Sequence, residues 1–143
     1  MFVSTAMRFL GDVIEIFLQK EIPAFKHNHE SSHIVSNFIQ YNDKGDLLAF
    51  NEHLIHSFNK NEYEIHGTPY FQSIVNRPNV ILLGDTIGDV GMSSGMKNLK
   101  QILKIGFLND STPSKLALYQ SVFDLVICDN PTFDVPNEIL RAI

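Results

Sequence analysis

Apolar residues in the second half of the chain gather in short continuous runs, each of which ends in glycine, aspartate or asparagine. The runs are NVILLGD, QILKIGFLND and FDLVICD. Runs of this kind are typical of strands buried on both faces of a parallel sheet. Between and around them lie four predicted helices: GTPYFQSIV, Ile87 to Met96, STPSKLALYQSVF and DVPNEILRAI. This alternation from residue 68 onward predicts an α/β domain with a mostly parallel sheet.

The first half of the chain has a different pattern. Apolar residues recur at helical spacing and predict an amphipathic helix over Gly11 to Glu21, which ends before Pro23. The segment HIVSNFIQY is rich in β-branched and aromatic residues and predicts a strand. The turn residues NDKGD follow it, so LLAF is expected to pair back as a hairpin. LIHSFNK predicts a third short extended segment.

Composition and charge narrow the class of protein. The chain has 143 residues, of which 44% are hydrophobic, so it can form a folded core. Its formal net charge of −5 disfavours a nucleic-acid-binding face, which would be basic. No segment predicts a membrane span or an export signal. The single cysteine, Cys128, excludes an internal disulfide and favours a cytoplasmic protein; it lies in the apolar run LVICD and is expected to be buried.

Two aspartates follow the first of the apolar runs, in ILLGDTIGDVG. Asp85 comes directly after the predicted strand, and Asp89 comes four residues later. Ligands bind outside the carboxyl ends of strands in sheets of this kind, and two carboxylates there can hold Mg²⁺ together with waters and a phosphate oxygen. The same residues also suit a structural role, because an aspartate can cap a helix or favour its N-terminus. The spacing leaves both interpretations open.

Other motifs fit this segment less well. It lacks the G-x-G-x-x-G pattern of dinucleotide-binding folds and the Gly-Lys-Ser/Thr of a phosphate-binding P-loop. An EF-hand loop that started at Asp85 would need a glutamate at its twelfth position, which is Met96. The histidines of KHNHESSH are expected to lie on a solvated surface rather than to bind a metal.

Taken together, ILLGDTIGDVGM and ILKIGFLND resemble the C-terminal half of the cytosolic 5′-nucleotidase III (pyrimidine 5′-nucleotidase) family, which belongs to the haloacid dehalogenase (HAD) superfamily. The resemblance extends to VSNFIQYNDKGDLLAF, LIHSFNK and FDLVICDN. It implies a partial HAD-like Rossmannoid core with a mostly parallel sheet and a small β-hairpin. Residues 1–143 would then form the C-terminal part of one HAD-like core domain.

The resemblance also implies roles for three residues. The metal-binding motif of the superfamily matches Asp85 and Asp89, which would hold Mg²⁺. Its lysine motif matches Lys60, which would neutralise the phosphate; an ammonium group suits this task because it is a compact charge. Without the family, Lys60 is interpreted as a solvated lysine in the polar turn NKNEYE.

Two other motifs of the superfamily are absent or altered. No D-x-D-x-T sequence, which would supply the aspartate nucleophile, occurs in the chain. The strand that carries this motif in the family, and the cap region that helps to recognise the base, are also missing. The phosphate-binding serine of the family falls on Met7, and Ser4 or Thr5 would replace it only after a shift of two or three residues.

The resemblance predicts a 5′-nucleotidase that hydrolyses nucleoside 5′-monophosphates, with pyrimidine bases favoured, to nucleoside and phosphate with Mg²⁺. Because the nucleophile is missing, we expect the chain to be inactive alone. The missing strand would leave a sheet edge open, so we also expect self-association. The alternative is a non-catalytic interaction or regulatory remnant of a HAD phosphatase. A receiver-like signalling domain has its acid pair after the first strand and fits less well.

Overall fold

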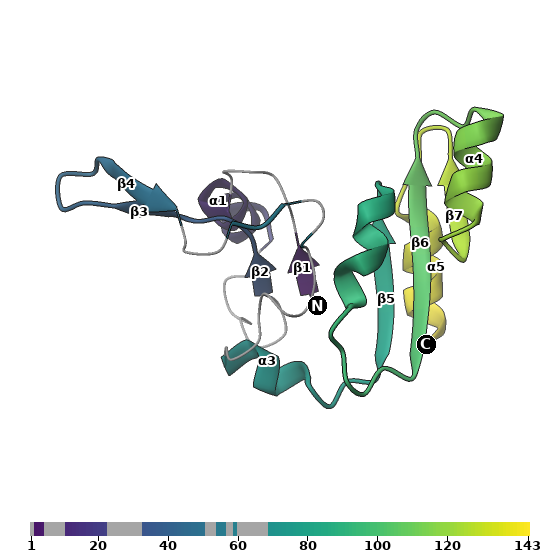
Figure 1. Ribbon diagram of the computed structural model, residues 1–143, viewed down its shortest axis with the longest axis horizontal. Coiled ribbons are helices and arrows are strands. Elements are labelled where there is room, and N and C mark those ends of the chain that lie inside the picture. Colours follow the sequence, from purple (N-terminus) through teal and green to yellow (C-terminus); the bar gives the residue numbers. More distant parts are fainter. Residues whose placement is uncertain (1, 5–10, 23–32, 51–53, 57–58, 60–68) are drawn as a thin grey trace. The chain divides into compact units, whose positions relative to one another are not determined.

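The structure is a computed structural model that describes residues 2–4, 11–22, 33–50, 54–56, 59 and 69–143 (Figure 1). The chain divides into two compact units, Met1–Asn76 and Arg77–Ile143, and each is described by itself. The prediction of a single domain stays a prediction. Within the described ranges, every helix is too short or too polar to cross a membrane.

The first unit contains short strands and two described helices. Strand β1 (Phe2–Ser4) pairs in parallel with β2 (His33–Val35), and β3 (Ile39–Tyr41) pairs in antiparallel fashion with β4 (Leu47–Phe50). Helix α1 (Gly11–Glu21) has the bounds that the hydrophobic spacing predicts. Helix α3 (Pro69–Ile74) begins at the predicted proline.

The predicted hairpin is confirmed, and its turn is held by one side chain. Asn42 Oδ1 accepts hydrogen bonds from the backbone N–H groups of Lys44 and Asp46, both at 2.9 Å. Gly45 has φ +84°, a left-handed conformation that glycine adopts at low cost. The turn chemistry of NDKGD therefore brings β4 back alongside β3.

The predicted single strand HIVSNFIQY is divided, because its backbone leaves the extended ladder between Val35 and Ile39. Asn37 is 1% exposed, and its side chain binds the backbone of Ile55 twice. Asn37 Nδ2 donates to Ile55 O at 2.9 Å, and Ile55 N donates to Asn37 Oδ1 at 2.7 Å. A side-chain amide thus replaces a strand partner for Ile55, and Leu54–His56 are not part of a strand ladder. Ser57, Phe58 and Lys60 of LIHSFNK lie outside the described residues, so the predicted extended segment stays a prediction.

The core of the first unit is small. Val35, Ile55 and Phe71 are buried together, and half-buried side chains of α3 and the residue after it pack against them. The ring of His33 stacks on that of Tyr70, with centroids 4.3 Å apart. His33 is therefore half-buried and less solvated than expected; His27 and His29 lie outside the described residues.

The second unit is a three-stranded parallel sheet in the order β5-β6-β7, as the apolar runs predict. The strands are β5 (Asn79–Gly84), β6 (Gln101–Leu108) and β7 (Leu125–Cys128). Ile105 of the central strand has no exposed surface, and Leu82, Leu108 and Phe123 are also buried. Cys128 is only half-buried, contrary to expectation, because β7 lies at an edge of the described sheet.

Helices connect and follow these strands. The 3-10 helix η2 (Ile87–Ser93) is shorter and tighter than the predicted helix over Ile87 to Met96, and two glycines within it disfavour a regular α-helix. Helix α4 (Pro113–Gln120) lies against β6 and β7. Helix α5 (Asp134–Ala142) closes the unit.

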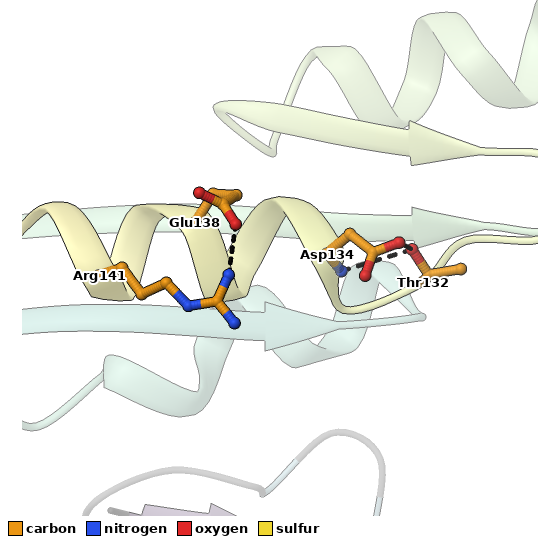
Figure 2. A network of polar contacts seen from close by, with 4 residues as sticks. All are labelled: Thr132, Asp134, Glu138 and Arg141. Atoms are coloured by element: carbon orange, nitrogen blue, oxygen red, sulfur yellow. Dashed lines mark hydrogen bonds and ion pairs between the residues drawn. The ribbon is translucent and has the colours of Figure 1, made fainter.

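Figure 2 shows the polar contacts along α5. At its start, Thr132 Oγ1 donates to Asp134 Oδ2 at 2.7 Å, and near its end Arg141 pairs with Glu138 one turn away. All four side chains belong to exposed residues, so such contacts add little to stability. They organise the surface of the helix and are not part of the candidate site.

Candidate metal site

The candidate site lies at the carboxyl end of β5. This strand ends at Gly84, Asp85 and Thr86 form the connection, and η2 begins at Ile87. Gly84 pairs in register with Gly106 of β6, so the carboxyl ends of two parallel strands meet here. This edge is the usual place for a ligand site in a parallel α/β sheet.

Asp89 organises the connection. It is 2% exposed, and its Oδ2 atom accepts three hydrogen bonds: from the backbone N–H of Asp85 at 3.1 Å, from the backbone N–H of Thr86 at 3.0 Å and from Thr86 Oγ1 at 2.9 Å. A buried carboxylate needs such donors to offset its loss of water. Asp89 also lies in the first turn of η2, so it has the structural role that an acid at a helix N-terminus can have.

Gly84 makes this arrangement possible. A Cβ atom at this position would lie 2.5 Å from Asp89 Cβ and 3.0 Å from Asp89 Oδ2, closer than side chains approach. Any larger residue would displace the carboxylate from the two N–H groups. The glycine before the first aspartate therefore provides the space that the second aspartate fills.

Asp85 has the opposite environment. Its side chain belongs to an exposed residue at the sheet edge, while its backbone N–H is held by Asp89. Two carboxylates four residues apart, one exposed and one buried beneath it, fit the chemistry of Mg²⁺, which binds to one or two protein carboxylates and keeps waters or substrate oxygens as its other ligands. No group of three or more His, Cys, Asp or Glu side chains with metal-binding geometry occurs among the residues that the structure describes.

Tyr119 of α4 also belongs to the site, and no sequence motif marks it. Its hydroxyl donates a hydrogen bond of 2.6 Å to the backbone carbonyl of Asp85, 34 residues away. Burial raises the pKa of Tyr119, and the negative charges of Asp85 and Asp89 raise it further, whereas Lys115 lowers it. The hydroxyl therefore keeps its proton and acts as a donor. In sequence, Tyr119 has the helical spacing of an ordinary core residue.

The neighbouring strand end contributes less than its position suggests. Leu108 is buried, and the ring of Phe107 packs against that of Phe133 with centroids 5.3 Å apart. Asp110 forms an ion pair with Lys115 of α4, in keeping with an acid placed just before a helix. Ser111 Oγ donates to Asp129 Oδ1 at 2.7 Å, which ties the ends of β6 and β7 together.

The other predicted site residues are not placed. Lys60, Thr5 and Met7 lie outside the described residues, and Ser4 is described only as the last residue of β1. The association of Lys60 with the two aspartates therefore stays a prediction. The structure brings Asp85 and Asp89 together and adds Tyr119 to them.

The chain is similar to known proteins in both sequence and structure. The sequence profile of a family described as pyrimidine 5′-nucleotidase (UMPH-1) matches residues 2–143. The 7-methylguanosine phosphate-specific 5′-nucleotidase of Mus musculus is 40% identical over 134 residues, which are 94% of this chain and 43% of that protein. The protein of the same name in Drosophila melanogaster is 40% identical over 116 residues, 80% of this chain and 36% of the relative.

A solved structure is also similar. The crystal structure of cytosolic 5′-nucleotidase IIIB bound to cytidine matches with a TM-score of 0.82 and 35% identity, over 98% of this chain and 45% of that one. The chain thus spans less than half the length of the relatives that it matches. The resemblance found in the sequence motifs is confirmed, and the chain belongs to the pyrimidine 5′-nucleotidase family of HAD-like proteins.

Proposed function

We propose that this chain supplies the Mg²⁺ site of a 5′-nucleotidase that hydrolyses nucleoside 5′-monophosphates to nucleoside and phosphate. The observation that carries the proposal is the loop after β5, in which a buried Asp89 holds the backbone of an exposed Asp85. The family supports the reaction class, since its members are 5′-nucleotidases.

Each residue has a distinct task in this proposal. When bound, Mg²⁺ would neutralise charge on the transferring phosphoryl group. Asp85 and Asp89 are the two proposed ligands: Asp85 presents its carboxylate at the sheet edge, and Asp89 also keeps the loop in the conformation that orients Asp85. Lys60, by resemblance, neutralises a further phosphate charge. The nucleophilic aspartate of the superfamily has no counterpart in these 143 residues.

The substrate is proposed at the level of its class. The family is described by pyrimidine nucleotides, and one similar structure contains cytidine, whereas several relatives are named for 7-methylguanosine phosphate. The substrate class common to these proteins is a nucleoside 5′-monophosphate, which we propose for this chain. The preference for pyrimidine bases stays a prediction. The protein would act in nucleotide metabolism in the cytoplasm, as the name of the similar cytosolic nucleotidase suggests.

The isolated chain is proposed to be inactive and to associate with itself. Among the described strands, β5 pairs with β6 on one side and with none on the other. An open edge of an apolar parallel strand is a site for pairing with another chain. The same observation favours the second candidate function, a non-catalytic interaction or regulatory module that pairs through this edge.

The metal site can be tested by titration of the ¹⁵N-labelled chain with Mg²⁺, followed by NMR. We expect saturable shifts of the amide signals of Asp85 to Asp89, which Asp85→Asn should abolish because it removes the exposed carboxylate charge. Asp110→Asn is the matched control, since Asp110 is an acid at the neighbouring strand end that pairs with Lys115. Equal loss in both variants, or no response in the wild-type chain, would contradict the proposed site.

Activity is tested separately with cytidine and 7-methylguanosine 5′-monophosphates. The pure chain is expected to release no phosphate above background in the presence of Mg²⁺. Release that depends on Asp85 would show that the chain is a complete enzyme and would overturn the proposed inactivity.

A further inference from the structure

Three backbone groups next to the Asp85 side chain are held by hydrogen bonds. The N–H of Asp85 and the N–H of Thr86 both donate to Asp89 Oδ2, at 3.1 and 3.0 Å. The carbonyl oxygen of Asp85 accepts a hydrogen bond of 2.6 Å from the hydroxyl of Tyr119. The peptide group between Asp85 and Thr86 is therefore held at its oxygen by Tyr119 and at its nitrogen by Asp89.

This arrangement fixes the backbone angles of Asp85. Peptide groups are planar, so the orientations of the two planes on either side of a Cα atom define φ and ψ of that residue. Asp89 holds the plane before Asp85, and Asp89 and Tyr119 together hold the plane after it. The direction of the Cα–Cβ bond of Asp85 follows from these planes.

Tyr119 is attached to the sheet through an aromatic contact. Its ring stacks on that of Phe123, one helical turn away along the chain, with centroids 5.5 Å apart. Phe123 is 4% exposed and lies over Gly106, where a Cβ atom would be 2.7 Å from the Phe123 ring. The aromatic pair is thus seated directly on the central strand β6.

The same register connects both supports of the loop. Gly106 is the partner of Gly84, the residue that makes room for Asp89. Partner positions of neighbouring strands face the same side of a sheet. Gly84 of β5 therefore makes room for Asp89, and Gly106 of β6 makes room for Phe123. Asp89 binds the nitrogen of the Asp85–Thr86 peptide group, and Tyr119, stacked on Phe123, binds its oxygen.

We propose that Tyr119 is a positioning residue of the Mg²⁺ site, which acts through the backbone carbonyl of Asp85 to aim the Asp85 carboxylate at the cation. The inference rests on the proposed function in one respect, the binding of Mg²⁺ by Asp85. Tyr119 touches neither the cation nor the substrate in this role. Its hydroxyl supplies the support, and its ring supplies the attachment to the sheet.

Tyr119→Phe tests the hydroxyl alone, because the ring and its packing on Phe123 are kept. In the full chain, the Mg²⁺ dissociation constant measured from the amide shifts should rise about tenfold, as is usual when a residue that orients a metal ligand is lost. Without Mg²⁺, hydrogen exchange at the Thr86 amide should become about fivefold faster, since one hydrogen bond of its peptide group is missing.

Leu116→Ala is the control for stability. Leu116 is a half-buried residue of the same helix, so its truncation weakens α4 but leaves the Tyr119 hydroxyl in place. We expect this variant to unfold at a lower temperature than the wild-type chain and to bind Mg²⁺ with unchanged affinity. A general loss of helix stability would affect both variants alike.

The outcomes separate this inference from the proposed function. If the wild-type chain binds Mg²⁺ and Tyr119→Phe changes neither the affinity nor the hydrogen exchange at Thr86, then the positioning role is overturned and the metal site is left intact. Equal weakening in Leu116→Ala would also overturn it, because the effect would then be one of stability. An absent response in the wild-type chain would overturn the metal site and this inference with it.

Discussion

The two units of this chain satisfy their buried backbone groups in different ways. In the second unit, β5 and β6 pair over six residues and β6 and β7 over four, so the sheet itself supplies most partners. In the first unit, β1 and β2 pair over three residues, and the side chain of Asn37 completes the bonding of Ile55. In the described part of the first unit, a single side chain therefore substitutes for a strand partner, whereas in the second unit side chains such as Asp89 and Asp124 supplement a regular ladder.

The difference also explains where the candidate site is well defined. The loop after β5 is anchored to paired positions of a regular sheet, because Asp89 packs against Gly84 of β5 and Phe123 packs against Gly106 of β6. The loop is thus placed by strands that are distant in the sequence, together with Tyr119 of α4. Substitutions at one residue in each unit, and a change of pH, should affect the two units differently.

The largest effect is expected for Asn37→Ala. This change leaves the N–H and the carbonyl of buried Ile55 without their side-chain partner, which should cost about 3 kcal/mol of unfolding free energy. The measurement is chemical denaturation combined with hydrogen exchange, in which protection should fall in the first unit before the second.

Gln40→Ala is the control for Asn37→Ala, since Gln40 is an exposed residue of β3. It should change the unfolding free energy by less than about 0.5 kcal/mol. If Asn37→Ala lowers protection equally in both units, then this side chain does not stabilise the first unit specifically.

An intermediate effect is expected for Gly106→Ala. The new Cβ atom would lie 2.7 Å from the Phe123 ring, so the ring must shift and the unfolding free energy should fall by about 2 kcal/mol. Gly91→Ala is the matched control, because no atom lies within 4 Å of the Cβ position there. Similar costs in both variants, measured by thermal denaturation, would show that close packing over β6 is not the cause.

The smallest effect is a dependence of stability on pH in the first unit. Burial lowers the pKa of His33 below 6.5, and the nearby Glu15 opposes this change. The unfolded chain therefore takes up a proton at a higher pH than the folded chain, so stability should decrease as pH falls below about 6.5. His33→Phe keeps an aromatic ring against Tyr70 and should lose this part of the pH dependence in denaturation curves from pH 7.5 to 5.

If His33→Phe and the wild-type chain show the same dependence between these values, then His33 does not titrate with a lowered pKa. The expected effect is small because the imidazole is only partly buried, and solvent screens its charge. The effect arises from one residue, so the difference between the denaturation curves of the wild-type chain and His33→Phe measures it directly.

Much of the second unit is predictable from the sequence. Its three continuous apolar runs correspond to β5, β6 and β7, and the proline-led segment between the last two forms α4. These elements are predictable because strands buried on both faces need apolar residues at every position, and this requirement is local. The pairing of Asp85 with Asp89 is equally local, since the two residues lie in one turn of the chain.

The first unit is less predictable, and so is the support of the site. The periodicity of HIVSNFIQY does not reveal the break at Asn37, because the break depends on a bond to Ile55, 18 residues away. The role of Tyr119 is not predictable for a similar reason. Its hydrogen-bond partner is a backbone carbonyl, and every residue has one, so the sequence does not show which carbonyl it binds.

Residue type at short spacing is enough to predict the class of the sheet, the membership of a nucleotidase family and the two aspartates of the candidate site. The tertiary structure alone decided that Asp89 is buried beneath the loop, that Asp85 is exposed above it, and that Tyr119 reaches the same peptide group from α4. These features need the register of Gly84 with Gly106, which becomes defined only when two distant strands pair.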